Sequence, residues 1–219
     1  MILLAADVGE GGGADELLLP MLDAANVCCG AHAGSAAITA ATALRCTELL
    51  VKVGAHPGYQ DRANFGRAEV ALTAEQIEEL LEGQVATLAE TVRPAFLKPH
   101  GALYHRCQTD AAAAAAAARV ARRWGLALVG QPEFGLVAAA LELGVPAWRE
   151  GYADRGYRSD GSLVPRQEPG AVLDPNAAGR QALTLARSGR FDVICLHGDS
   201  PAALDVAAAV RRVLPKIGA

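Results

Sequence analysis

The sequence predicts an α/β barrel of about seven parallel strands, formed by residues 1–219 as a single domain. Two observations predict this fold. Short apolar segments alternate with longer segments rich in Ala and Leu, and strict alternation of this kind favours parallel strands with helices outside them. The short segments are also apolar almost throughout, which is typical of a sheet buried on both faces. An open, doubly wound sheet has the same alternation and remains the alternative.

The expected strands are followed in most cases by Gly, Pro, His or Asp, which are typical of strand ends. They cover residues 2–6, 26–30, 51–55, 95–98, 126–129, 145–148 and 193–196. Thr73 has the pattern of a helix N-cap, Pro175 lies near the start of a helix, and Pro201 begins the last one. The eight alanines at 111–118 favour an ordinary helix. The segment 151–173 lacks helix signals, which predicts a binding loop or a lid.

Composition and charge exclude several classes of protein. With 52% apolar and 20% charged residues, the chain is not disordered. A net charge of −4 without a basic run gives no electrostatic reason to expect a nucleic-acid partner or an anionic membrane, and we expect neither. No apolar segment reaches the ~20 residues that span a bilayer, and the first residues do not resemble a signal peptide. The five cysteines contain no C-x-x-C pair, so we expect reduced thiols in a cytoplasmic protein.

Four of the five histidines share one local setting. Each follows an apolar strand and has a Gly within two residues; they are His32, His56, His100 and His197. Because the carboxyl ends of barrel strands open on one face, these imidazoles are expected to converge there. A single histidine in this setting is more often structural, whereas four of them favour a functional site.

Acidic residues are expected on the same face. Asp7 and Glu10 follow the first strand, Asp154 follows the sixth, and Asp199 lies two residues after His197. Carboxylates beside imidazoles form acid/base pairs, orient an imidazole tautomer or complete a metal site with an open position. An acid at the end of an apolar strand favours function for Asp7, while capping explains Asp199 equally well.

Basic residues also lie at the expected strand ends and loops. Lys98 is the only charge in its strand and is expected to point into the mouth of the site, where it could hold a carboxylate. Arg67, Arg155 and Arg166 lie in expected loops and could clamp a carboxylate or phosphate, with solvated loop arginines as the alternative. The Gly-rich segment 9–13 lacks the G-K-[ST] ending of a Walker motif, so nothing in the sequence indicates a self-sufficient ATP site.

The ordered set of motifs resembles the LamB/YcsF family over nearly the whole chain. The motifs are DVGEG at 7–11, ANVCCGAHAG at 25–34, GAHPGY at 54–59, NFGR at 64–67, KPHGALY at 98–104, REGYADR at 149–155, DGSLVPR at 160–166 and HGD at 197–199. The chain departs from the family pattern at Ala5, where the family has Asn, and at Ser35 and Ala68, where it has an acid and an Arg. Ala5 cannot supply the hydrogen bond that an Asn would give near Asp7.

The resemblance implies an irregular barrel related to deacetylase-type barrels and a role as the A subunit of an ATP-dependent 5-oxoprolinase. Such an enzyme is a hydrolase that opens the cyclic amide of 5-oxo-L-proline (pyroglutamate) to L-glutamate while ATP is hydrolysed. ATP, with its Mg²⁺, would be handled together with the partner B and C subunits, and a homo-oligomer is compatible with this role. Two alternatives stay open: a stand-alone metal-dependent amide or N-acetyl hydrolase, and a non-catalytic subunit that presents substrate.

The residues matched by the motifs are assigned to expected roles. The expected catalytic residues are Asp7, Glu10, His32, His56, His100 and His197. The expected substrate-binding residues are Lys98, Arg67, Asp154, Arg155, Arg166 and Asp199. If a divalent metal binds, as fold analogy with the deacetylases suggests, its expected ligands are Asp7, His32 and His56.

Overall fold

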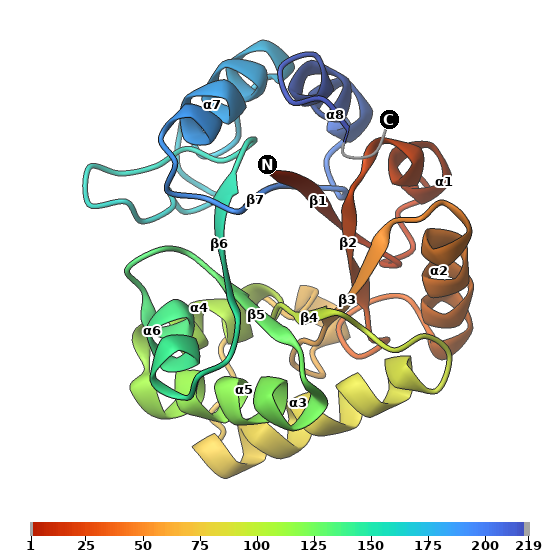
Figure 1. The fold of residues 1–219 in the computed structure, drawn as a ribbon, viewed down its shortest axis with the longest axis vertical. Helices are drawn as coiled ribbons and strands as arrows, with labels where there is room; N and C mark the ends of the chain where they lie inside the picture. The colour runs from red at the N-terminus through yellow and green to blue at the C-terminus, as the bar shows by residue number, and fades with distance from the viewer. Residues whose placement is uncertain (1, 217–219) are drawn as a thin grey trace.

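A computed structural model of the protein describes residues 2–216, and within them seven parallel strands form one closed barrel (Figure 1). Neighbours along the chain pair with each other, and the last strand pairs with the first. The strands are β1 (Leu3–Val8), β2 (Ala24–Cys28), β3 (Lys52–His56), β4 (Phe96–Leu97), β5 (Ala127–Gly130), β6 (Ala147–Tyr152) and β7 (Val193–His197). The barrel prediction is confirmed, and the open sheet is excluded.

Helices surround the barrel on its outside (Figure 1). They are α1 (Asp15–Leu18), α2 (Ala36–Glu48), α3 (Ala74–Ala89), α4 (Gly101–Thr109), α5 (Ala111–Trp124), α6 (Gly135–Glu142), α7 (Pro175–Arg187) and α8 (Ala203–Arg211), with short 3₁₀ turns at Leu19–Met21 and Arg62–Asn64. Thr73 caps α3 in a reciprocal capping box with Gln76, as its pattern predicts. The last helix begins at Ala203, because Pro201 lies in the turn that precedes it.

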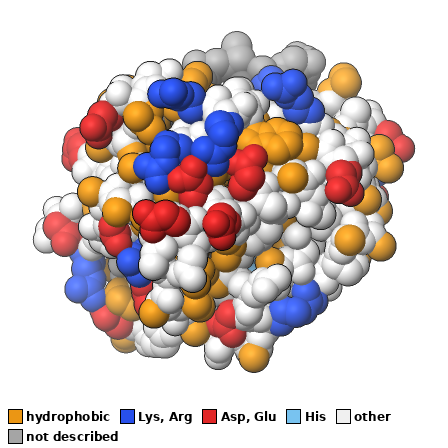
Figure 2. Space-filling view, turned by 90° about the horizontal axis from the view of Figure 1, so that it is seen from below, with side chains coloured by type: hydrophobic (Ala, Val, Ile, Leu, Met, Phe, Trp, Pro, Cys, Tyr) orange, Lys and Arg blue, Asp and Glu red, His pale blue; other side chains and the backbone are white. Residues whose placement is uncertain are grey.

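The alanine run and its surroundings show how the outer layer is held. Most of the alanines in α5 are buried, since their small side chains let this helix pack closely on its neighbours. Arg119 and Arg123 of α5 pair with Glu78 of α3, and Arg123 also pairs with Glu82. Figure 2 views the molecule from the side of α3 and α5, where acidic and basic side chains lie next to one another. No helix among the described residues is long and apolar enough to cross a membrane.

The barrel interior has two layers. The lower layer, toward the amino ends of the strands, is an apolar cluster in which the rings of Phe96 and Trp148 lie 4.8 Å apart. It comprises Leu3, Ala5, Ala24, Phe96, Ala127, Val129, Trp148 and Val193. A Cβ on Gly54 would lie 2.0 Å from the Phe96 ring, so this ring requires glycine on β3. Alternate residues of a strand face the same side, so the next inward positions form an upper, polar layer: Asp7, Asn26, Lys98, Glu150 and Cys195.

The segment predicted to be a functional loop begins after β6, which continues to Tyr152 beyond its expected end at residue 148. The loop has two isolated bridges, Arg155 with Val172 and Tyr157 with Leu163. Its start is held to α7 by Gln181, whose Nε2 donates to the backbone oxygens of Tyr152 and Arg155. Residues 163–167 of this loop line the cavity described below, in agreement with the prediction of a binding loop.

Candidate active site

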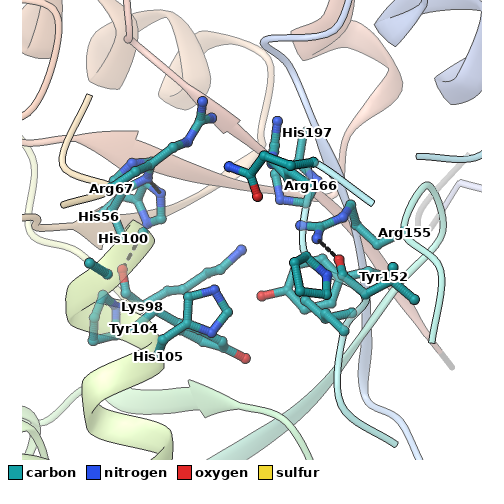
Figure 3. Close-up of a pocket in the computed structure, with 17 residues that line it drawn as sticks. His56, Arg67, Lys98, His100, Tyr104, His105, Tyr152, Arg155, Arg166 and His197 are labelled. Carbon is teal, nitrogen blue, oxygen red and sulfur yellow. Dashed lines mark hydrogen bonds between the residues drawn. The ribbon is translucent and has the colours of Figure 1, made fainter. Parts of the chain in front are cut away.

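A cavity of about 400 Å³ lies at the carboxyl ends of β3, β4, β6 and β7 (Figure 3). His56 and His100 lie on one side of it, and Arg155 lies on the other. The labelled side chains that line it are His56, Arg67, Lys98, His100, Tyr104, His105, Tyr152, Arg155, Arg166 and His197. The face predicted from the strand ends is therefore where imidazoles and guanidiniums are gathered.

Lys98 lies inside a buried ion cluster at the floor of the cavity. Its Nζ is 3.2 Å from Asp7 Oδ1, 3.2 Å from Glu150 Oε2 and 3.1 Å from the Cys195 sulfur. Burial would lower the pKa of Lys98, but the charge of Asp7 and its other neighbours hold it well above its usual value. Lys98 was expected to point into the mouth of the site; it lines the cavity, but it is buried at the floor and two carboxylates of the chain pair with it.

Asp7 is held in place from two sides. Asn26, its register partner on β2, donates Nδ2 to Asp7 Oδ1 at 2.7 Å. Burial would raise the pKa of Asp7, but the Lys98 ammonium and then His56 hold it well below its ordinary value. Ala5 lies in the lower apolar layer. The amide hydrogen bond to Asp7 therefore comes from the neighbouring strand.

Three of the predicted histidines and one acid form a second cluster, which we call the histidine cluster: Glu10, His32, His56 and His100. His56 Nε2 is 3.0 Å from His100 Nδ1, and Glu10 Oε1 is 3.2 Å from His32 Nε2 and 3.6 Å from His100 Nδ1. One nitrogen or oxygen of each lies within 4.8 Å of the others, close enough for a metal site.

The composition of this cluster differs from the metal ligands expected, which were Asp7, His32 and His56. Glu10 and His100 join His32 and His56 here, while Asp7 is outside the group. Asp7 lies beside this cluster, because Asn26 and Lys98 hold its Oδ1 while its Oδ2 is 3.5 Å from His56 Nε2.

Glycines make the packing of the histidine cluster feasible. The rings of His32 and His100 stack with centroids 3.8 Å apart and planes 1° from parallel. A Cβ on Gly58 would lie 2.6 Å from His32 Nδ1, and one on Gly66 would lie 2.8 Å from His32 Cβ. The loop that carries Phe65 and Gly66 turns through positive φ angles to pass over the stack.

The histidine cluster is buried, and burial sets its protonation. Burial, and then the charge of His56, lower the pKa of His32 to about 3 and that of His100 to about 2. Burial, and then the charge of Asp7, raise the pKa of Glu10 to about 7. His32 and His100 are therefore neutral near pH 7, which is the form of imidazole that acts as a base or as a metal ligand.

His197 and Asp154 form a pair at the mouth of the cavity. His197 Nδ1 lies 3.1 Å from both oxygens of Asp154, and the His197 amide also donates to Asp154 Oδ2 at 3.0 Å. Burial would raise the pKa of Asp154, but His197 lowers it below its ordinary value. Asp154 is expected to bind substrate; in the structure its carboxylate lies against His197 Nδ1, where it accepts a hydrogen bond from that nitrogen and orients the ring.

The three predicted arginines differ in their partners. Arg67 and Arg166 both contact Asp199, so Asp199 bridges two guanidiniums and caps no helix. Arg155 is buried and donates only to the backbone oxygens of Ala171 and Val164. Burial, and then the charge of Arg166, lower its pKa. Among the described residues no carboxylate pairs with Arg155, so it is the arginine most available to an anion.

Sequence reasoning missed several residues of the upper layer. Glu150 pairs with Lys98 and accepts a hydrogen bond of 3.0 Å from the Tyr152 hydroxyl, and Asn26 supports Asp7. Glu150 could have been predicted as a site residue, because it is a charged residue just after an apolar segment. His105 lines the cavity from α4 but had no assigned role.

Comparison with known proteins gives a consistent picture. A model of the LamB/YcsF family matches residues 2–219. A protein of Chloroflexus aggregans, named as the A subunit of 5-oxoprolinase, is 39% identical, with 98% of this chain and 95% of that protein covered. The crystal structure of a lactam utilization protein from Thermus thermophilus has a TM-score of 0.89 and 34% identity, covering 97% of this chain and 95% of that one.

A more distant solved structure shares the fold alone. A family 4 carbohydrate esterase from Streptomyces lividans, solved in complex with acetate, matches with a TM-score of 0.53 and 15% identity, covering 97% of this chain and 86% of that chain. The expected likeness to deacetylase-type barrels is confirmed at the level of fold.

Proposed function

Because the chain belongs to the LamB/YcsF family, we propose that it is the A subunit of an ATP-dependent 5-oxoprolinase. The reaction consumes 5-oxo-L-proline, ATP and two water molecules, and it yields L-glutamate, ADP and phosphate. ADP leaves when the γ-phosphoryl group is transferred to the lactam oxygen; one water then opens the C–N bond, and the other releases phosphate from the resulting γ-carboxyl phosphate. The protein would act in the cytoplasm with the partner B and C subunits.

One observation carries this proposal: the cavity combines an unpaired buried cation with an oriented base. The substrate has one carboxylate and one stable amide. Arg155 offers a guanidinium without a carboxylate partner among the described residues, and His197 offers Nε2 with Asp154 behind it. We propose that Arg155 binds the substrate carboxylate and that His197 Nε2 takes a proton from the attacking water, with Asp154 stabilising the imidazolium.

The buried ion cluster has a different role in this proposal. Lys98 contacts both Asp7 and Glu150 at the floor of the cavity and holds the pKa of Asp7 below its ordinary value. Lys98 thereby positions Asp7 beside His56, with Asp7 Oδ2 3.5 Å from His56 Nε2. Arg67 and Arg166, whose charge is partly balanced by Asp199, would bind phosphoryl oxygens near the mouth.

ATP enters the proposal through the chemistry and the partners. A five-membered lactam is a stable amide, and transfer of the γ-phosphoryl group to its oxygen makes the carbonyl carbon susceptible to water. Segment 9–13 has no Walker ending, so we assign the binding of ATP with its Mg²⁺ mainly to the B and C subunits.

The test is glutamate release from 5-oxo-L-proline by the purified protein, with and without the B and C subunits, ATP and Mg²⁺. We expect turnover only when all are present. In that assay His197→Gln is expected to lower kcat by about 10²–10⁴-fold, whereas Arg155→Met is expected to raise KM by about tenfold or more. A fully active His197→Gln variant would contradict the assigned base. If the variant instead loses complex formation, the substrate-presenting role replaces the catalytic one.

The histidine cluster favours a second candidate, a metal-dependent amide hydrolase that works alone. Imidazoles and a carboxylate beside a cavity are typical of hydrolytic metal sites. This candidate predicts amide hydrolysis without ATP or partners and its loss on treatment with a chelator. The same assay therefore separates the two, because only the first candidate requires ATP.

A further inference from the structure

Two imidazole nitrogens face each other in the wall of the cavity. His56 Nδ1 is 2.8 Å from the backbone oxygen of Lys98, and His100 Nε2 is 2.9 Å from the backbone oxygen of Phe65. A carbonyl oxygen only accepts, so each of these nitrogens carries the hydrogen. In a neutral imidazole the other nitrogen then holds a lone pair. The two lone-pair nitrogens, His56 Nε2 and His100 Nδ1, lie 3.0 Å apart.

Two such lone pairs facing each other hold either a shared proton or a metal ion between them. A carboxylate lies beside this pair, since Glu10 Oε1 is 3.6 Å from His100 Nδ1. Ligand atoms bound to one tetrahedral zinc ion lie about 3.3 Å from each other. The separations of 3.0 Å and 3.6 Å bracket that value. These two separations suit ligands of one metal ion, and all the ligand atoms of the histidine cluster lie within 4.8 Å of one another.

The surrounding charges support a divalent ion. Asp7, Glu10 and Glu150 contribute three carboxylates to the two adjoining clusters, and Lys98 is the one amine among the described residues that neutralises them. Two negative charges are therefore unmatched when all three acids are ionised. Asp7 Oδ2, at 3.5 Å from His56 Nε2, places one of them next to the proposed ion.

His32 is excluded as a ligand by its stacking. The lone pair of an imidazole nitrogen lies in the plane of its ring. The rings of His32 and His100 are parallel within 1° and their centroids are 3.8 Å apart, so no ion can lie in both planes. His32 Nε2 instead contacts Glu10 Oε1 at 3.2 Å, the arrangement by which a neighbouring side chain orients a ligating carboxylate.

We propose that His56, His100 and Glu10 bind one divalent transition-metal ion, with His32 as the positioning residue for Glu10. Two imidazoles and one carboxylate are a ligand set of catalytic zinc sites, which keep a further position for water or substrate. His56 and His100 line the cavity, so that position would open toward it. The inference concerns ion binding by this chain and holds whichever reaction the cavity performs.

The experiment is equilibrium dialysis of the untagged protein against micromolar Zn²⁺, with bound metal counted by mass spectrometry. We expect one Zn²⁺ per chain. His56→Gln and His100→Gln should abolish stoichiometric binding, and so should the nearly isosteric Glu10→Gln. His32→Gln should keep the stoichiometry with an affinity about 10–100-fold weaker. His105→Gln, which changes a cavity histidine outside the cluster, is the matched control and should bind Zn²⁺ normally.

Failure of the wild type to bind Zn²⁺, or equal binding by His100→Gln, would overturn the site. Loss of stoichiometric binding in His32→Gln would overturn the assignment of His32 as a positioning residue. Circular dichroism of each variant identifies any that are unfolded. If a histidine variant is unfolded, the visible spectrum of the Co²⁺-loaded Glu10→Gln protein tests the site in place of that variant's Zn²⁺ stoichiometry. Because neither measurement uses ATP or 5-oxoproline, the result is independent of the proposed oxoprolinase activity.

Discussion

The lower and upper layers of the barrel interior are built from the same strands but have opposite chemistry. Inward residues two positions apart, on four strands and in one case just after the strand end, are Ala5 and Asp7, Phe96 and Lys98, Trp148 and Glu150, and Val193 and Cys195. The lower members fill space, whereas the upper members are charged or polar and contact one another. One step along a strand therefore separates the packed floor of the barrel from the proposed chemistry.

The largest effect is expected from breaking the upper layer at its amine, Lys98. Lys98→Met leaves Asp7 and Glu150 buried without a counter-ion and should lower the free energy of unfolding by about 3–5 kcal/mol. Urea denaturation at pH 7 measures it. Turnover in the assembled enzyme should also be lost, because Asp7 loses the group that keeps it ionised. A Lys98→Met protein as stable as the wild type would show that the two acids are not held as ions.

The lower layer is tested by adding volume. Gly54→Ala places a methyl group against the Phe96 ring and should cost about 1–3 kcal/mol of unfolding free energy. In a Phe96→Leu background the same change should cost less, because the obstructing ring is gone. A double-mutant cycle measured by urea denaturation checks this coupling. Equal penalties in both backgrounds would contradict the packing described for the lower layer.

At the mouth of the cavity, Asp154 should link stability to pH. Burial alone would raise its pKa, but the pairing with His197 outweighs burial, so the net shift is downward. A lowered pKa means that the carboxylate stabilises the fold above its unfolded pKa of about 3.9, and that this contribution is lost as pH falls through the folded pKa. Asp154→Asn should therefore be less stable by about 1–3 kcal/mol at pH 7. The gap should close as the pH falls below about 4 in thermal melts, and a constant gap across this range would contradict the pairing.

The smallest effect is expected outside the barrel. Arg123 pairs with Glu78 and Glu82 on the exposed surface between α5 and α3. Exposed ion pairs contribute about 0.2–1 kcal/mol, so Arg123→Ala should change the unfolding free energy little, and added salt at about 0.5 M should reduce even that difference. A loss of unfolding free energy as large as that expected for Lys98→Met would contradict the proposed difference between interior and surface charges.

Much of the fold was predictable because strand residues in a closed parallel barrel are apolar toward the helices and partly toward the interior. The expected end of β6 was too early because Arg149 and Glu150 interrupt the apolar pattern, and only the closed barrel shows that Glu150 is buried against Lys98. The convergence of His32, His56 and His100 followed from the common exit face of the strands.

The partners within the site were less predictable. Asn26 meets Asp7 only because β1 and β2 pair in one particular register, and motif spacing does not set that register. Asp154, just after β6, contacts His197 at the end of β7, because these two strands are neighbours in the barrel. The hydrogen-bond partners of Arg155 depend on the path of the loop after β6. The sequence indicated where this loop lies in the chain but not the path that it follows.

Closure of the barrel by β7 has a consequence for folding. β1 gains its second neighbour only when residues 193–197 arrive, nearly a whole chain length later, and contacts between such distant segments form slowly. Until then Asp7, Lys98 and Glu150, which lie on or directly after three separate strands, must remain hydrated. Expulsion of that water and docking of the last strand should therefore be one late event, so that a chain stalled before β7 presents two unpaired strand edges and is prone to aggregate.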